Sequence, residues 1–129
     1  MVNSDFLKNL NNAQKEAVMY LDGPLLIVAG AGSGKTKVLT TRIANIIKEK
    51  KAFPNQILAV TFTNKAAAEM KSRVSNMVNF PIDRMWLGTF HSLSLKILRK
   101  HYDKINLKQN FVIIDTDDQL KLIKKICDQ

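Results

Sequence analysis

The sequence predicts an α/β fold in which helices flank a parallel sheet, and three observations support this. Short apolar runs at residues 25–28, 57–62 and 85–88 have the length of buried strands. Each run is followed by a turn and then by a segment whose apolar residues recur at helical spacing. Strands that alternate with helices form βαβ units, which build parallel sheets. The 129 residues suit one domain with one hydrophobic core.

The first half of the chain is predicted to contain a helix, a strand and a second helix. The first helix is expected over residues 7–21, with Asn11 or Asn12 as its N-cap and an apolar stripe formed by Leu10, Ala13, Ala17, Val18 and Leu21. A turn at residues 22–24 leads into the strand at 25–28. The second helix is expected over residues 35–49, with an apolar stripe formed by Leu39, Ile43, Ile46 and Ile47.

The second half continues the alternation. The run 57–62 is apolar without alternating, so both faces of this strand are expected to be buried. A helix over residues 65–78 follows, capped by Thr63 or Asn64, with a buried stripe formed by Ala66, Met70, Val74 and Met77. After the third strand, a helix is expected over residues 91–102. A last helix reaches residue 127 from a cap at Asp115, to which we assign no catalytic role.

Composition restricts the class of partner. Lys and Arg number 20 against 11 Asp and Glu, a net charge of +9, which favours a polyanionic partner such as nucleic acid. A basic surface without such a partner would have the same composition, so charge alone does not decide. Cys127 is the only cysteine, which excludes an internal disulfide and fits a reducing cytoplasm. No apolar run approaches the about 18 residues that span a bilayer, and no secretory signal is recognisable, so no membrane association is expected.

A glycine-rich turn between the first strand and the second helix has the pattern of a phosphate-binding loop. It consists of Ala29, Gly30, Ala31, Gly32, Ser33, Gly34, Lys35 and Thr36, and it departs from the usual pattern only in having Ala29 in place of the first glycine. Glycines let successive backbone N–H groups curl around an anion, and the helix N-terminus adds its dipole. Lys35 is expected to reach the β/γ-phosphates of a nucleotide, and the Thr36 hydroxyl is expected to hold Mg²⁺.

Four ordered blocks of sequence resemble the superfamily 1 DNA helicases of the UvrD/Rep/PcrA type. The first runs from Leu10 to Val18 around Gln14, and the second is the phosphate loop. The third is the block Thr61 to Met70, and the fourth is Gly88 to Ser92. Residues 114–119 also resemble the start of the helical subdomain that is inserted in these proteins.

The resemblance implies an ATP-dependent helicase that moves 3′-to-5′ on DNA, with ATP and Mg²⁺ as cofactors and with Lys35 and Thr36 as catalytic residues. Gln14 corresponds to the glutamine that contacts adenine, and the residues of the loop bind the phosphates. Lys37 stands where the family usually has an arginine over the adenine, so it offers a cation–π contact without a planar guanidinium. Single-stranded DNA is expected to contact Phe62, Thr63, Asn64, Lys65, Thr89, Phe90, His91 and Ser92, because aromatic rings stack on bases while polar groups hold phosphates.

The same resemblance implies a RecA-like three-layer sheet that is truncated. Residues 1–100 would form the N-terminal part of the ATP-binding lobe, and residues 101–129 the start of the inserted helical subdomain. The remainder of a helicase chain would then be a partner, and this part alone is expected to lack turnover. Two alternatives stay open: a small phosphotransferase of the kinase type with the same loop, or a non-enzymatic nucleotide-binding module.

Overall fold

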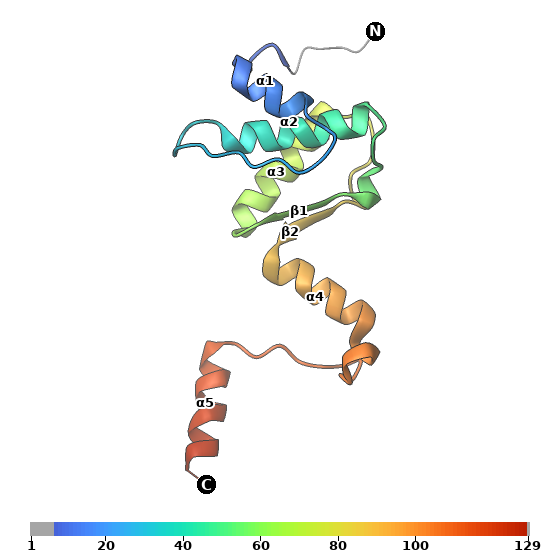
Figure 1. Cartoon of the computed structure of the whole chain (residues 1–129). Helices are drawn as coiled ribbons and strands as arrows, with labels where there is room; N and C mark the ends of the chain where they lie inside the picture. The colour runs from blue at the N-terminus through green and yellow to red at the C-terminus, as the bar shows by residue number, and fades with distance from the viewer. Residues whose placement is uncertain (1–6, 129) are drawn as a thin grey trace. The chain divides into compact units, whose positions relative to one another are not determined.

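The computed structural model describes residues 7–128 (Figure 1). Its elements in chain order are α1 (Asn12–Met19), α2 (Lys35–Lys48), the 3₁₀ helix η2 (Pro54–Gln56), β1 (Leu58–Thr61), α3 (Asn64–Met77), β2 (Trp86–Thr89), α4 (Phe90–His101), the 3₁₀ helix η3 (Tyr102–Ile105) and α5 (Thr116–Cys127). The described residues fall into two compact units that divide between Ser94 and Leu95. The first unit contains the glycine-rich loop.

Strands β1 and β2 form a parallel sheet, as the alternation of strands and helices predicts. Leu58 lies opposite Trp86 and Thr61 lies opposite Thr89, so the two strands end at the same level. The prediction that both faces of β1 are buried is wrong. Ala59 is buried, whereas the side chain of Leu58 is 62% exposed, because the hydrophobic core packs against the face of the strand that carries Ala59.

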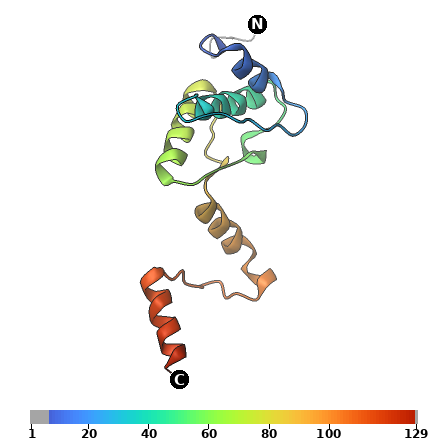
Figure 2. The same ribbon diagram turned by 60° about the vertical axis from the view of Figure 1, so that its left-hand side comes forward.

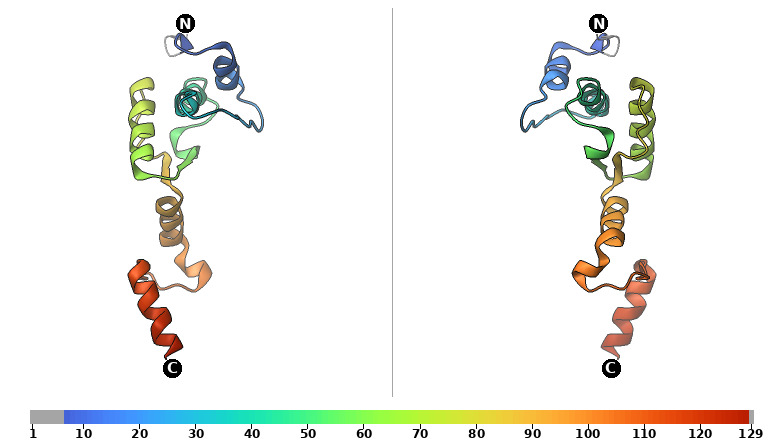
Figure 3. Two further views of the ribbon diagram at one scale, coloured as in Figure 1. Left: turned by 90° about the vertical axis from the view of Figure 1, so that its left-hand side faces the viewer. Right: turned by 90° about the vertical axis from the view of Figure 1, so that its right-hand side faces the viewer.

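The main core of the first unit lies between α2, α3 and the sheet. It is formed by Ile43, Ala44, Ile47, Ala59, Met70, Val74, Val78, Ile82 and Met85. Met70 and Val74 belong to the stripe predicted for α3, whose N-cap is Thr63. Figure 3 shows α2 between α1 and α3. Because α2 is covered on two sides, its buried surface is wider than the predicted stripe and displaced from it: Val38 is buried against Leu10 and Val18, while Leu39 is 40% exposed.

Helix α1 is shorter than the sequence predicts and begins at Asn12 rather than at residue 7. Its N-cap is Asn11, which is one of the two residues that the sequence predicts for this position. The Asn11 side chain accepts a hydrogen bond from the backbone N–H of Gln14 at 2.9 Å, and the Gln14 side chain accepts one from the backbone N–H of Asn11 at 3.0 Å. This reciprocal capping box defines the start of the helix, because it uses N–H groups that the first turn cannot pair internally.

The strand predicted at residues 25–28 is not formed. The side chains of Leu26 and Val28 are 86% and 89% exposed, and neither β1 nor β2 pairs with this segment. The side chains of Lys37 and Asn45 on α2 bind the carbonyls of Asn9 and Val18, so α1 runs parallel to α2. Residues 21–34 must therefore return along α2 to its first turn, as Figures 1 and 2 show. A strand is stabilised by pairing with a neighbour, and this segment has none among the described residues.

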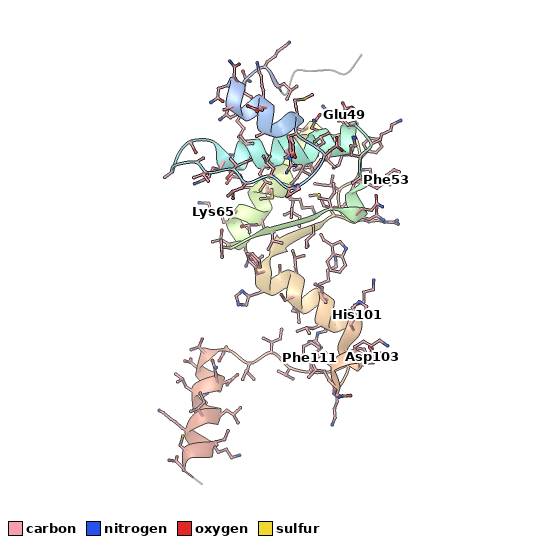
Figure 4. The ribbon with its side chains drawn as sticks, viewed as in Figure 1. Glu49, Phe53, Lys65, His101, Asp103 and Phe111 are labelled. Carbon is pink, nitrogen blue, oxygen red and sulfur yellow. The ribbon has the colours of Figure 1, made fainter. Side chains whose placement is uncertain are left out.

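The second unit contains the end of α4, η3 and α5. The guanidinium of Arg99 lies 4.0 Å from the centre of the Phe111 ring and donates a hydrogen bond to the carbonyl of Gln109 at 3.0 Å. Figure 4 labels Phe111 and also Asp103, which belongs to η3. Helix α5 is capped by Asp115 as predicted, through a bond from the backbone N–H of Asp118 at 2.9 Å. The apolar side chains of Leu120, Ile123 and Ile126 on α5 are about half exposed.

Candidate functional site

The glycine-rich loop leads directly into the N-terminus of α2. Gly32 has φ 74° and Gly34, the N-cap of the helix, has φ 85°. A Cβ atom disfavours this left-handed conformation, so both positions favour glycine. A Cβ atom built on Gly30 or Gly32 would meet no atom within 4 Å, so the backbone of the loop borders open space. The residues therefore fit an anion that approaches the backbone closely, which a Cβ at these positions would obstruct.

Three contacts close the loop on itself. The ammonium of Lys35 donates a hydrogen bond to the carbonyl of Ala29 at 2.8 Å, across the mouth of the loop. The backbone N–H of Ser33 bonds to the carbonyl of Gly30 at 3.3 Å, and the Ser33 hydroxyl donates to the same carbonyl. Thr36 follows in the first turn of α2, with an exposed side chain. Lys35 thus lies at the loop and Thr36 in the first turn of α2, while their contacts with phosphate and Mg²⁺ stay predictions.

Helix α1 contributes Gln14 to the same site. Its side-chain Nε2 donates a hydrogen bond to the carbonyl of Ser33 at 3.1 Å, while its Oε1 serves in the capping box. A Cβ on Gly34 would lie 3.1 Å from this Nε2 atom, so the amide of Gln14 rests against the backbone of the loop. A cavity of about 190 Å³ borders Gln14, Ser33 and Lys35. The structure therefore brings the first two blocks of the sequence together.

Lys37, which the resemblance places near the adenine, contacts the segment that precedes α1. Its Nζ atom donates a hydrogen bond to the carbonyl of Asn9 at 2.7 Å, in the segment just before α1. The side chain is partly buried and links α2 to the start of the α1 region.

A second cluster forms where β1 and β2 end. Because Thr61 and Thr89 are paired across the sheet, the residues that follow them are neighbours. The rings of Phe62 and Phe90 have centroids 5.3 Å apart and are tilted by 45°. Their side chains are 88% and 52% exposed, so neither ring is part of the hydrophobic core. Two exposed aromatic rings side by side offer stacking surfaces for unpaired bases.

The polar members of this cluster divide into two groups. Thr63 caps α3 by accepting the N–H of Ala66 at 3.1 Å. Thr89 is buried and accepts the N–H of Ser92 at 3.2 Å, so it orders the start of α4. The remaining members, Asn64, Lys65 and His91, are exposed. Lys65 is labelled in Figure 4, at the start of α3.

Sequence reasoning missed two residues of α2 that hold α1 in place. Nε and Nη2 of Arg42 both donate to the carbonyl of Tyr20, at 3.1 and 2.8 Å. Asn45, which is 2% exposed, donates from Nδ2 to the carbonyl of Val18 at 3.2 Å. The signal for Asn45 was present in the sequence, because an amide among isoleucines on a buried helix face needs a hydrogen-bond partner.

The chain matches the UvrD/REP helicase N-terminal domain over residues 10–129. It is 53% identical to the ATP-dependent DNA helicase PcrA of Bacillus subtilis over 125 residues, which are 97% of this chain and 17% of that protein. It is 54% identical to DNA helicase II of Rickettsia typhi over 129 residues, 98% of this chain and 19% of that protein. The chain thus spans less than a fifth of the length of these relatives. Within residues 7–128, no helix is long and apolar enough to cross a membrane. On the strength of this match, together with the loop and the aromatic pair, the chain belongs to the UvrD/REP helicase family.

Proposed function

We propose that this chain is the N-terminal ATP- and single-stranded-DNA-binding part of an ATP-dependent DNA helicase that moves 3′-to-5′. The observation that carries the proposal is the glycine loop at the N-terminus of α2, with Lys35 across its mouth and Gln14 against its backbone. The relatives are named as DNA helicases, which agrees with it. The proposal includes a RecA-like three-layer sheet, completed by further segments of a helicase chain.

The nucleotide site would use the loop for the phosphates and α1 for the base. The backbone N–H groups of residues 29–34 and the dipole of α2 would bind the phosphate oxygens, and the Thr36 hydroxyl would hold Mg²⁺. Lys35 would exchange its bond to the Ala29 carbonyl for one to the β/γ-phosphates, which keeps the ammonium paired in both states. Gln14 and Lys37 would lie toward the adenine. Bound Mg²⁺–ATP would supply the phosphoanhydride bond whose hydrolysis drives a helicase.

Single-stranded DNA would bind at the paired strand ends. Phe62 and Phe90 would offer their faces to bases, while Asn64, Lys65 and His91 would contact the backbone. Thr63, Thr89 and Ser92 would add contacts, and their capping bonds hold the two helix starts that frame the rings. The net charge of +9 favours such a polyanion and predicts that affinity falls as salt rises. No observation favours the phosphotransferase alternative.

Titration with fluorescent ATP and ADP in the presence of Mg²⁺ tests the nucleotide site. We expect Lys35→Ala to weaken ATP binding more than ADP binding, because ADP lacks the γ-phosphate that the ammonium would contact. A charge-assisted hydrogen bond contributes about 1.5–3 kcal/mol, so the loss for ATP should exceed tenfold. Lys15→Ala, which removes an exposed lysine from α1, is the matched control. Equal losses for ATP and ADP would show that Lys35 does not contact the γ-phosphate, and the absence of any nucleotide binding would refute the proposed site.

A further inference from the structure

Helix α1 places Gln14 against the phosphate loop, but the helix contains few residues that could hold its own position. It has only eight residues, and Val18 is its one fully buried side chain among those described. Helices of this length are marginal in isolation, so their position depends on tertiary contacts. The last turn of α1 also contains no basic residue to interact with its carbonyl end. The position of Gln14 must therefore be determined by what α1 is attached to.

Helix α2 supplies that attachment at the carbonyl end of α1. The guanidinium of Arg42 places two N–H donors on the carbonyl of Tyr20, at 2.8 and 3.1 Å. The buried amide of Asn45 binds the carbonyl of Val18 at 3.2 Å. The cation of Arg42 thus lies at the negative end of the α1 dipole. No basic residue in the last turn of α1 offsets that negative charge. These contacts fix the end of α1 along and around its own axis.

Gln14 is then held at a defined distance from the loop. Tyr20 is six residues from Gln14, which is about 9 Å along a helix. A shift of α1 by one ångström at this end would change the 3.1 Å bond between Gln14 Nε2 and the Ser33 carbonyl by a similar amount. Hydrogen bonds weaken steeply over that range. Arg42 and Asn45 donate hydrogen bonds to the carbonyl end of α1. Neither residue lines the cavity at Gln14, so both act on the site only through the helix.

We propose that Arg42 and Asn45 are positioning residues for nucleotide binding: by holding α1 on α2 they keep Gln14 on the Ser33 carbonyl. This inference rests on the proposed function, since it concerns the same site. Arg42 affects the affinity for the nucleotide without touching it. Its effect is expressed only while Gln14 is present, which separates it from a general contribution to stability.

A double-mutant cycle tests the proposal on the whole chain. The four proteins are the wild type, Arg42→Ala, Gln14→Ala and the double variant, each titrated with fluorescent Mg²⁺–ATP and melted in parallel. We expect Arg42→Ala to weaken nucleotide binding about threefold to tenfold, the range of one lost hydrogen bond at Gln14. In the Gln14→Ala background the same change should weaken binding less than about twofold. Arg73→Ala, which removes an exposed arginine from α3, controls for the loss of an arginine elsewhere.

A second measurement needs no nucleotide and tests the position of Gln14 directly. If the wild type binds no nucleotide, that result refutes the proposed function, and this second measurement still tests whether Arg42 and Asn45 position Gln14. The side-chain amide signals of Gln14 in ¹⁵N spectra should shift in Arg42→Ala and Asn45→Ala but not in Arg73→Ala. If Arg42→Ala does not fold, Arg42→Lys replaces it, because lysine keeps the cation at the helix end but loses the paired donors. Equal losses of affinity in both backgrounds, or unchanged Gln14 signals, would overturn the proposal.

Discussion

Replacing Phe62 by alanine separates a DNA-contacting role from a packing role. The ring is 88% exposed, so about an eighth of its area is buried. A phenylalanine side chain offers roughly 200 Å², and at about 25 cal/mol per Å² the buried part contributes about 0.6 kcal/mol. The tilted contact with Phe90 adds about 0.5–1.5 kcal/mol. Phe62→Ala should therefore lower the free energy of unfolding by no more than about 2 kcal/mol, against about 3–5 kcal/mol for a buried phenylalanine.

The same substitution should have a larger effect on DNA. A base stacked on an aromatic ring contributes about 1–3 kcal/mol, so the dissociation constant for single-stranded DNA should rise about fivefold to 150-fold. Fluorescence anisotropy with a labelled oligothymidine, beside urea unfolding, measures both quantities. Phe53→Ala is the matched control, because Phe53 is also exposed, at 68%, but precedes β1 at the opposite end of the strand (Figure 4).

Two results would refute this reasoning. A loss of more than about 3 kcal/mol in unfolding free energy with unchanged DNA affinity would place Phe62 in the core. An equal loss of DNA affinity in Phe62→Ala and Phe53→Ala would show that the strand ends have no special part in binding.

Three further predictions concern the backbone and the chemistry. Lys50 has φ 54° just after the C-cap of α2, so Lys50→Gly should raise the free energy of unfolding by about 0.5–1 kcal/mol, and unchanged stability in urea would contradict this. A Cβ on Gly88 would lie 2.6 Å from Ser92 Oγ, so Gly88→Ala should cost about 1–3 kcal/mol, and a wild-type melting temperature would contradict that. The chain alone should bind Mg²⁺–ATP without turning it over at helicase rates, since phosphoryl transfer also needs a group that positions water and a cation at the transferred phosphoryl. Hydrolysis of several ATP per second, stimulated by DNA and abolished by Lys35→Ala, would refute this last prediction.

Much of the candidate site was predictable because its signals are local. Glycine is the residue that adopts a positive φ at the lowest cost, so the glycines at positions 32 and 34 favour a loop of this shape. The two aromatic residues follow strands that were expected to belong to one parallel sheet, and the pairing of these strands brings the rings of Phe62 and Phe90 to 5.3 Å between centroids. The roles assigned to these residues in binding ATP and DNA stay predictions. The attachment of α1 by Arg42 and Asn45 was not predicted. A buried amide such as Asn45 signals that it needs a hydrogen-bond partner, but no local pattern identifies a carbonyl more than twenty residues away as that partner.

The sequence by itself determined which side chains cap helices α1, α3 and α5. Side-chain caps at Asn11, Thr63 and Asp115 act within three residues, so local chemistry suffices to place them. Whether an apolar run becomes a strand was decided only by the tertiary structure. Residues 25–28 and 58–61 are similarly apolar, yet only the second pairs with a neighbouring strand. The physical reason is that a strand's hydrogen bonds lie outside it, so its formation depends on which segment the fold places alongside, whereas a helix satisfies its own backbone.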